Sequence, residues 1–143
     1  MDIRITFPGG KRVDAALGAH LVHTDQSVEH GGAGSAPEPF DLFLASLATC
    51  AGIYVLGFCQ ARQISADGIS LVQRHRFNEV DHSLEQVELD VLLPDDFPEK
   101  YRVAVIRAAL SCKVKKVLAA PPEIVVVAKA SDGTALATTA KAA

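Results

Sequence analysis

The sequence predicts an α+β protein built from antiparallel strands and one long buried helix. Three observations support this fold class: short segments with alternating hydrophobic residues, glycine and proline turns between them, and an uncharged stretch from Leu42 to Cys59. The chain of 143 residues has the length of one domain, and its 49% hydrophobic and 22% charged residues are typical of a packed protein. We therefore expect a single domain over residues 1–143.

The first part of the chain is predicted to form strands. Residues 2–7 alternate, the turn sequence PGG separates them from strand-like residues 11–15, and residues 19–25 resemble a third strand. Residues 26–39 concentrate glycine, serine and proline, which indicates an irregular connection. The chain therefore opens with a hairpin or meander that leads into a loop.

A long helix is predicted from Pro39 to Arg62. Pro39 suits the first helical position, and Asp41 in the first turn favours the positive end of the helix dipole. The uncharged run is long enough for a membrane-spanning helix, but polar side chains and two cysteines interrupt it. A helix that is buried on nearly every side accounts for the run better. Because a sheet covers only one face of such a helix, we expect a second copy of the chain to cover the other, in a homodimer.

The next segments predict a hairpin and a second helix. Residues 69–77 and 84–94 both alternate and are separated by the turn-like sequence NEVDHS. Residues 97–110 carry apolar side chains at mostly helical spacing, and Pro98 fits their first turn. We therefore expect two long antiparallel strands followed by a helix.

A third helix and a last strand complete the expected elements. Ser111 offers an N-cap for a helix over residues 112–120, which two prolines end. Residues 123–130 then read as a strand, and we assign no element to residues 131–143.

Charge and cysteine usage restrict the partners and the compartment. The net charge is −3 and the basic residues are scattered, so no broad basic surface is expected to bind nucleic acid. The first residues lack the apolar segment of a signal peptide, and three cysteines without a disulfide-framework spacing suit a reducing compartment. We expect a cytoplasmic protein that binds neither nucleic acid nor membranes. The histidines and cysteines match no zinc spacing, and the sequence predicts no metal or cofactor.

The three cysteines differ in their local setting. Cys50 and Cys59 are nine residues apart, which places them on nearly opposite sides of the long helix, so a cooperating pair must include Cys112. Cys112 lies at a predicted helix N-terminus and is followed by three lysines, a setting that stabilises a thiolate. Cys50 lies in mid-helix and needs a positive group from elsewhere to react. Otherwise, both helix cysteines are small core residues.

Two segments carry a resemblance to a known family. The sequence PFDLFLASLATC at residues 39–50, followed by AGIYVL, and the sequence SCKVKKVLAAPPEI at residues 111–124 resemble the two cysteine motifs of the OsmC/Ohr thiol peroxidases, in a divergent OsmC-like branch. The predicted order of elements is also similar. This resemblance implies antiparallel sheets wrapped around long central helices in an intertwined homodimer, with active sites at the subunit interface.

The resemblance also implies a mechanism. Cys50 matches the peroxidatic cysteine and Cys112 the resolving one, whereas Cys59 matches neither. The implied activity is the reduction of organic hydroperoxides through a Cys50 sulfenic acid and a Cys50–Cys112 disulfide, which a dithiol reductant reopens. A substrate pocket is expected to be lined by apolar side chains of the long helix: Phe40, Phe43, Leu47 and Tyr54.

One family feature is altered. Family members carry a glutamate ten residues before the reactive cysteine, paired with an arginine of the first strands, and here that position is Phe40. Asp41 occupies the acidic position of the divergent branch, or is only a helix N-terminal acid. Arg12 and Arg4 are the candidates for the arginine. Asp41 and Arg12 are thus the candidate supporting residues, and the alternative function is a non-catalytic or weakly reactive module that binds an apolar small molecule at the dimer interface.

Overall fold

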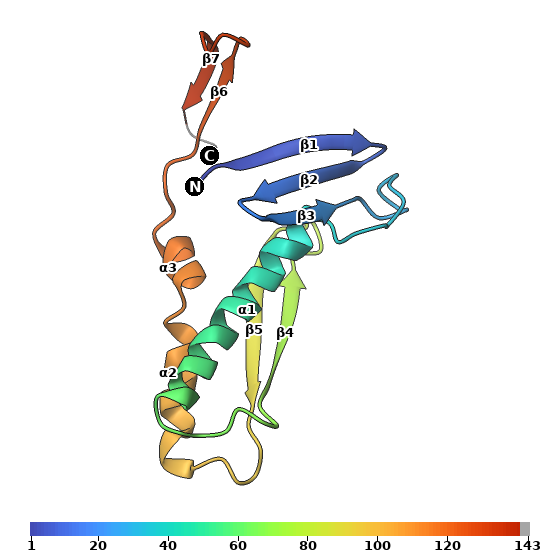
Figure 1. Ribbon diagram of the computed structural model, residues 1–143. Helices are drawn as coiled ribbons and strands as arrows, with labels where there is room; N and C mark the ends of the chain where they lie inside the picture. The colour runs from blue at the N-terminus through green and yellow to red at the C-terminus, as the bar shows by residue number, and fades with distance from the viewer. Residues whose placement is uncertain (141–143) are drawn as a thin grey trace.

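The computed structural model describes residues 1–140 and confirms the predicted α+β class (Figure 1). The first sheet is antiparallel and consists of β1 (Ile3–Gly9), β2 (Arg12–Leu17) and β3 (His20–Thr24) in that order. This is the expected opening meander. The sheet lies across the N-terminal end of α1 (Pro39–Gln60), the predicted long helix, which ends two residues earlier than expected.

The loop between β3 and α1 is more ordered than its composition indicates. The carboxylate of Asp25 is almost fully buried and accepts hydrogen bonds from the backbone N–H groups of Gln26, Ala33 and Ser35. The Ser35 hydroxyl also donates to this carboxylate at 2.7 Å, and it is the main reason that the pKa of Asp25 is lowered. A side chain at Gly32 would place its Cβ only 2.0 Å from the Gln26 carbonyl oxygen. The loop therefore closes around one buried carboxylate.

The start of α1 is fixed by Glu38, the residue before the predicted Pro39. Asp41 accepts the backbone N–H of Glu38 at 3.1 Å, one of the two bonds of a capping box. The carboxylate of Glu38 in turn accepts the backbone N–H of Ser27 at 2.9 Å and lies 2.8 Å from Nδ1 of His30. The same acidic residues thus cap the helix and attach the preceding loop to it.

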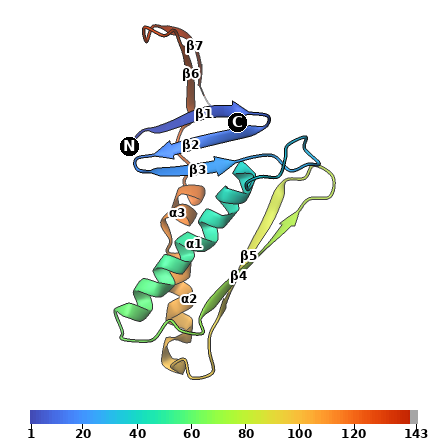
Figure 2. The same ribbon diagram turned by 45° about the vertical axis from the view of Figure 1, so that its right-hand side comes forward.

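The core forms where α1 is packed between a hairpin and α2. The hairpin consists of β4 (Ser70–Phe77) and β5 (Leu84–Leu92), and α2 spans Arg102–Leu110 after the short turn η1 (Glu99–Tyr101). Figure 2 shows α1, α2 and the hairpin together below the first sheet. The buried core side chains come mainly from α1 and α2: Ala51, Val55, Phe58, Cys59, Phe97, Val105 and Ala109.

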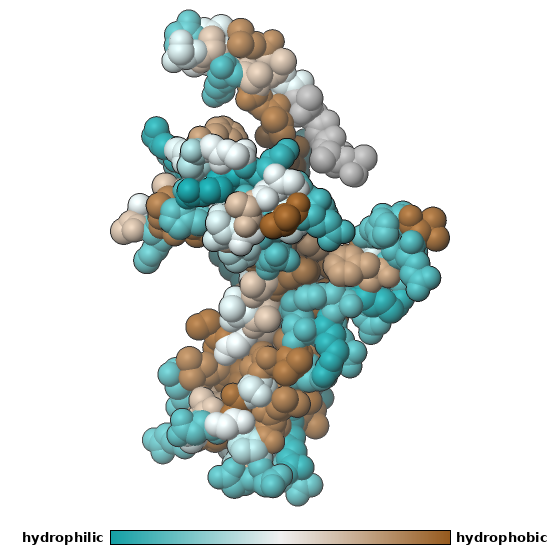
Figure 3. Space-filling view, turned by 90° about the vertical axis from the view of Figure 1, so that its right-hand side faces the viewer, coloured by the Kyte–Doolittle hydropathy of each residue, from teal (hydrophilic) through white to brown (hydrophobic). Residues whose placement is uncertain are grey.

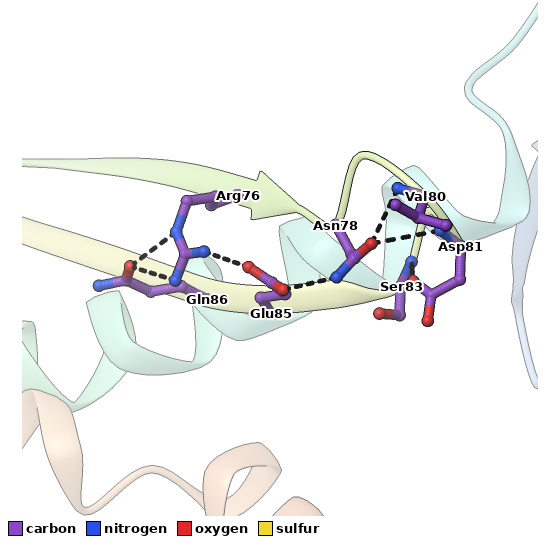
Figure 4. A network of polar contacts seen from close by, with 7 residues as sticks. All are labelled: Arg76, Asn78, Val80, Asp81, Ser83, Glu85 and Gln86. Carbon is purple, nitrogen blue, oxygen red and sulfur yellow. Dashed lines mark hydrogen bonds and ion pairs between the residues drawn. The ribbon is translucent and has the colours of Figure 1, made fainter.

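Polar contacts order the tip of the β4–β5 hairpin (Figure 4). The Asn78 side-chain oxygen accepts the backbone N–H groups of Val80 at 2.8 Å and Asp81 at 3.2 Å, while its amide nitrogen donates to Glu85 at 2.8 Å. Glu85 also pairs with Arg76 across the two strands. These bonds hold the strands together up to the end of β4 that faces the start of α1.

The last elements correct one expectation and complete another. Ser111 is not the N-cap of the third helix: its hydroxyl donates to the Arg107 carbonyl oxygen at the end of α2, and Cys112 is the N-cap of α3 (Lys113–Ala119). Local sequence does not separate these two neighbouring positions because both precede the helix.

A final hairpin of β6 (Val125–Lys129) and β7 (Ala135–Ala140) projects beyond the first sheet in both views (Figures 1 and 2). The strand β6 lies within the predicted strand, whereas β7 lies in the segment to which we assigned no element. Residues 141–143, which end both this segment and the expected domain, lie outside the described residues.

We predict that the ion pair of His30 and Glu38 stabilises the fold most between pH 4.5 and 6.5, the ordinary pKa values of the two groups. Hydrogen bonds from His30 first, and then from Ser27, lower the pKa of Glu38 to about 2, and Glu38 raises the pKa of His30. The glutamate contribution is therefore lost as the pH falls from 4.5 through about 2, and the histidine contribution as the pH rises through its raised value.

The measurement is the melting temperature of wild type and of His30→Gln between about pH 4.5 and about pH 9. The difference in melting temperature should be largest at about pH 5.5 and shrink by about pH 9. A difference that is the same at both pH values would contradict the prediction.

Candidate active site

Cys50 and Cys112, far apart in the sequence, meet where α1 passes the beginning of α3. The Cys112 thiol and the backbone N–H groups of Val114 and Lys113 lie close enough to the Cys50 thiol to lower its pKa. Cys112 is brought there because it is the residue that links the end of α2 to α3, and α2 packs along α1 through Val105 and Ala109.

These contacts favour the thiolate form of Cys50. The backbone N–H of Val114 is the largest influence that lowers the pKa of Cys50, with smaller ones from the Cys112 thiol, the Lys113 N–H and the charge of Lys115. Partial burial of the sulfur opposes them, and the net shift is downward. The sequence predicts that the N-terminus of the third helix stabilises a thiolate at Cys112. In the structure, the N–H groups of this N-terminus lower the pKa of Cys50 instead. A cysteine in mid-helix thus receives its activating group from another helix.

Cys112 is more enclosed than Cys50. Its side chain is fully buried, whereas that of Cys50 is partly exposed. The ammonium of Lys115 lies 3.7 Å from the Cys112 sulfur and donates to the Ala109 carbonyl oxygen at 3.2 Å. The two sulfurs of the pair therefore differ in access and in the charge beside them.

Cys59 belongs to the core and has a different character. It is fully buried in the core cluster that also contains Phe58 and Val105, and burial raises the pKa of its thiol. This agrees with the helical spacing, which places it on the side of α1 away from Cys50. Cys59 therefore contributes packing rather than an accessible thiol.

The apolar residues expected around the cysteine divide into two groups. Phe40 and Phe43 stack at 5.5 Å between ring centroids near the start of α1, and Phe77 of β4 joins them at 6.4 Å from Phe40. Leu47, one turn before Cys50, is buried, and Tyr54, one turn after Cys50, is partly exposed.

The sequence analysis did not identify Phe77 or its neighbour His75, whose ring lies 6.3 Å away. Strand alternation, which places both side chains on one face of β4, was the only available signal.

The two candidate supporting residues have other contacts. Asp41 accepts the N–H of Glu38 in the helix cap, and Arg12 donates to Asp14 at 3.3 Å. Arg12 also lines a surface cavity of about 460 Å³ beside the β1–β2 turn. Within residues 1–138, whose side chains the structure describes, no hydrogen bond or ion pair joins Arg12 or Asp41 to either cysteine of the pair. Their supporting role stays a prediction.

The described part of the chain contains no group of three or more histidine, cysteine, aspartate or glutamate side chains arranged to hold a metal ion.

Comparison with known proteins identifies the family. Residues 32–127 match the family model of the OsmC-like proteins, which covers most of the chain and both cysteines. The chain belongs to the OsmC-like protein family. No curated protein matches its sequence.

Solved OsmC-like structures share the fold. A Psychrobacter arcticus 273-4 protein, assigned to the osmotic-stress-induced and detoxification response, superposes with a TM-score of 0.69 at 22% identity, over 80% of this chain and 85% of that chain. The OsmC-like protein of Mycoplasma pneumoniae gives 0.67 at 13% identity, over 84% and 87%. An organic hydroperoxide resistance protein OsmC of Legionella pneumophila gives 0.55 at 17% identity, over 84% and 90%. These likenesses confirm the predicted OsmC-like fold.

We predict that Cys50 reacts with iodoacetamide at a lower pH than an ordinary thiol, because N–H groups and the Cys112 thiol stabilise its thiolate. The rate of alkylation at Cys50, followed by peptide mass spectrometry against pH, should have a midpoint below that measured for the same cysteine in urea. Cys59 is the internal control and should stay unlabelled until the protein unfolds. Equal midpoints for folded and unfolded Cys50 would contradict the prediction.

Proposed function

We propose that this protein is a thiol peroxidase that reduces organic hydroperoxides, with Cys50 as the peroxidatic and Cys112 as the resolving cysteine. The observation that carries the proposal is that the Cys112 thiol and the backbone N–H groups of α3 together lower the pKa of the partly exposed Cys50. A peroxidatic cysteine must be ionised and accessible, and a resolving cysteine must lie within bonding reach. The lowered pKa and partial exposure of Cys50, and the nearness of the Cys112 thiol, support these roles.

The reaction follows from that geometry. The Cys50 thiolate attacks the distal oxygen of the hydroperoxide, the O–O bond breaks, and the alcohol leaves with a proton while Cys50 becomes a sulfenic acid. The Cys112 thiol then attacks the Cys50 sulfur, water leaves, and a disulfide forms. A dithiol reductant reopens it, and we place this cycle in the cytoplasm, where such reductants keep thiols free.

The side chains around the helix favour an organic substrate. Leu47 and Tyr54 flank Cys50 on α1, and the stacked Phe40 and Phe43 continue the apolar surface toward β4. Such a lining gains free energy by removing an alkyl or aryl group from water and gains little from hydrogen peroxide. The proposed substrates are therefore hydroperoxides with a hydrophobic organic group.

The active unit is proposed to be a homodimer. α1 has the length and composition of a membrane span, criteria that the core helix of a soluble protein also meets, yet only 28% of its most apolar stretch is buried within one chain. Figure 3 shows hydrophobic side chains gathered below the first sheet, where the helices lie. The exposed apolar residues of the three helices include Ile53, Leu56, Val103, Ile106, Leu110, Val117 and Leu118. A soluble monomer rarely exposes such a surface, and a second copy would cover it.

A second candidate function is a binding module without peroxidase activity. Phe40 occupies the position of the family glutamate, and Arg12 pairs with Asp14 rather than with an acid near Cys50. In this alternative the same apolar surface holds a small molecule, and Cys50 is unreactive or only weakly reactive.

Intact-mass spectrometry after one equivalent of cumene hydroperoxide tests the peroxidase. Wild type should lose two hydrogens, Cys112→Ser should gain one oxygen as a sulfenic acid, and Cys50→Ser should not change. Cys59→Ser is the matched control and should behave as wild type, since its thiol is buried in the core. A folded wild-type protein whose mass does not change would support the binding module instead.

Size-exclusion chromatography with light scattering tests the dimer. Wild type should have twice the 15.1 kDa mass of one chain, and Ile53→Glu should weaken association by about 100-fold, because it buries an unpaired charge at the interface. The control is Val80→Glu in the turn between β4 and β5, which is 90% exposed and lies outside the three helices, and it should leave the mass unchanged. A wild-type protein that stays monomeric would overturn the proposed dimer.

A further inference from the structure

The two sulfurs of the pair are not equivalent targets for an external thiol. Cys112 has no exposed surface, because it is enclosed at the junction of α2 and α3, whereas Cys50 is partly exposed. Thiol–disulfide exchange requires the attacking sulfur to reach one of the two disulfide sulfurs, so access selects which of them is attacked. Access therefore directs an incoming reductant to Cys50.

Lys115 contacts the sulfur of Cys112, and its charge also acts on Cys50. Its ammonium is held by the Ala109 carbonyl oxygen at 3.2 Å and lies 3.7 Å from the Cys112 sulfur. Among the side chains that the structure describes, no carboxylate forms an ion pair with Lys115, so its charge is free to act on sulfur. The other lysines of α3, Lys113 and Lys116, are exposed to solvent. Lys115 is thus a fixed, half-buried cation in contact with the sulfur of Cys112.

We propose that Lys115 is a positioning residue that makes Cys112 the leaving thiolate, so that the reductant attacks Cys50 when the disulfide is reopened. The inference deepens the proposed function and rests on it, because the Cys50–Cys112 disulfide is the product of that reaction.

The disulfide is reduced in two exchange steps. A thiolate of the dithiol attacks the Cys50 sulfur, the Cys50–Cys112 bond breaks, and its electron pair leaves on Cys112 as a thiolate beside Lys115. The second thiol of the reductant then attacks the mixed disulfide at the reductant's own sulfur and releases the Cys50 thiolate. The dithiol loses two electrons and becomes a disulfide, and the protein gains them as two thiols.

Attack at Cys50 also limits which reductants can react. It must reach a partly exposed sulfur on α1 beside Tyr54, rather than enter the closed junction of α2 and α3. A small or flexible dithiol arm satisfies this condition.

The first test maps the attack in wild type. The disulfide is formed with diamide, so that the test does not require peroxidase activity, and the oxidised protein is treated briefly with glutathione, acid-quenched and alkylated. Peptide mass spectrometry should find glutathione on Cys50 and the alkyl group on Cys112. Glutathione on Cys112, or failure of diamide to join the two cysteines, would overturn the proposal.

The second test measures how fast dithiothreitol reduces the diamide-formed disulfide. Lys115→Met should be about fivefold slower than wild type because the leaving thiolate loses its cation, while Lys115→Arg should stay within about twofold. Lys116→Met, which removes an exposed lysine one residue away, is the matched control and should not change the rate. A Lys115→Met rate equal to wild type would overturn the role of Lys115. If this variant does not fold, the mapping in wild type decides.

The two proposals fail separately. A protein that cumene hydroperoxide does not oxidise, but whose diamide-formed disulfide is attacked at Cys50, would lose the peroxidase function and keep the inferred direction of exchange. A protein that reduces the hydroperoxide but is attacked at Cys112 would keep the function and lose the inference.

Discussion

The contact of the Cys50 sulfur with the first turn of α3 is the interaction on which the site depends. Backbone N–H groups of Val114 and Lys113 reach that sulfur only because α3 starts immediately after α2 ends. The end of α2 is in turn placed by the packing of Val105 and Ala109 against α1. The hydrophobic core therefore sets the position of the N–H groups near the Cys50 thiol. Loss of core packing would move these groups and change the pKa of Cys50.

The other end of α1 is fixed by a different kind of force. The buried carboxylate of Asp25 gathers the N–H groups of its loop, and Glu38 attaches the end of that loop to the helix. Both acids replace lost hydration with several donors, which is the condition for burying a charge.

The apolar composition of α1 has a double use in this protein. One face, with Val55 and Phe58, supplies the core of the single chain, and another, with Ile53 and Leu56, is left in solvent. In the proposed dimer the exposed face becomes interface, and in the proposed reaction its neighbours hold the organic part of a hydroperoxide. Main-chain donors and Lys115 would then perform the anion stabilisation for which related proteins use an arginine and a glutamate, so the phenylalanine at position 40 is compatible with a reactive thiol.

The sequence by itself determined the features that depend on local forces. Alternation located the strands of the first sheet and the β4–β5 hairpin, a proline located the start of α1, and two cysteine motifs indicated the family and the pair Cys50 and Cys112. Only the tertiary structure decided that the first turn of α3 lowers the pKa of Cys50, that Arg12 pairs with Asp14 and that Phe77 joins the aromatic cluster. Periodicity and helix capping act over a few residues, whereas these contacts join elements far apart in the chain, and their partners are selected by how the core packs.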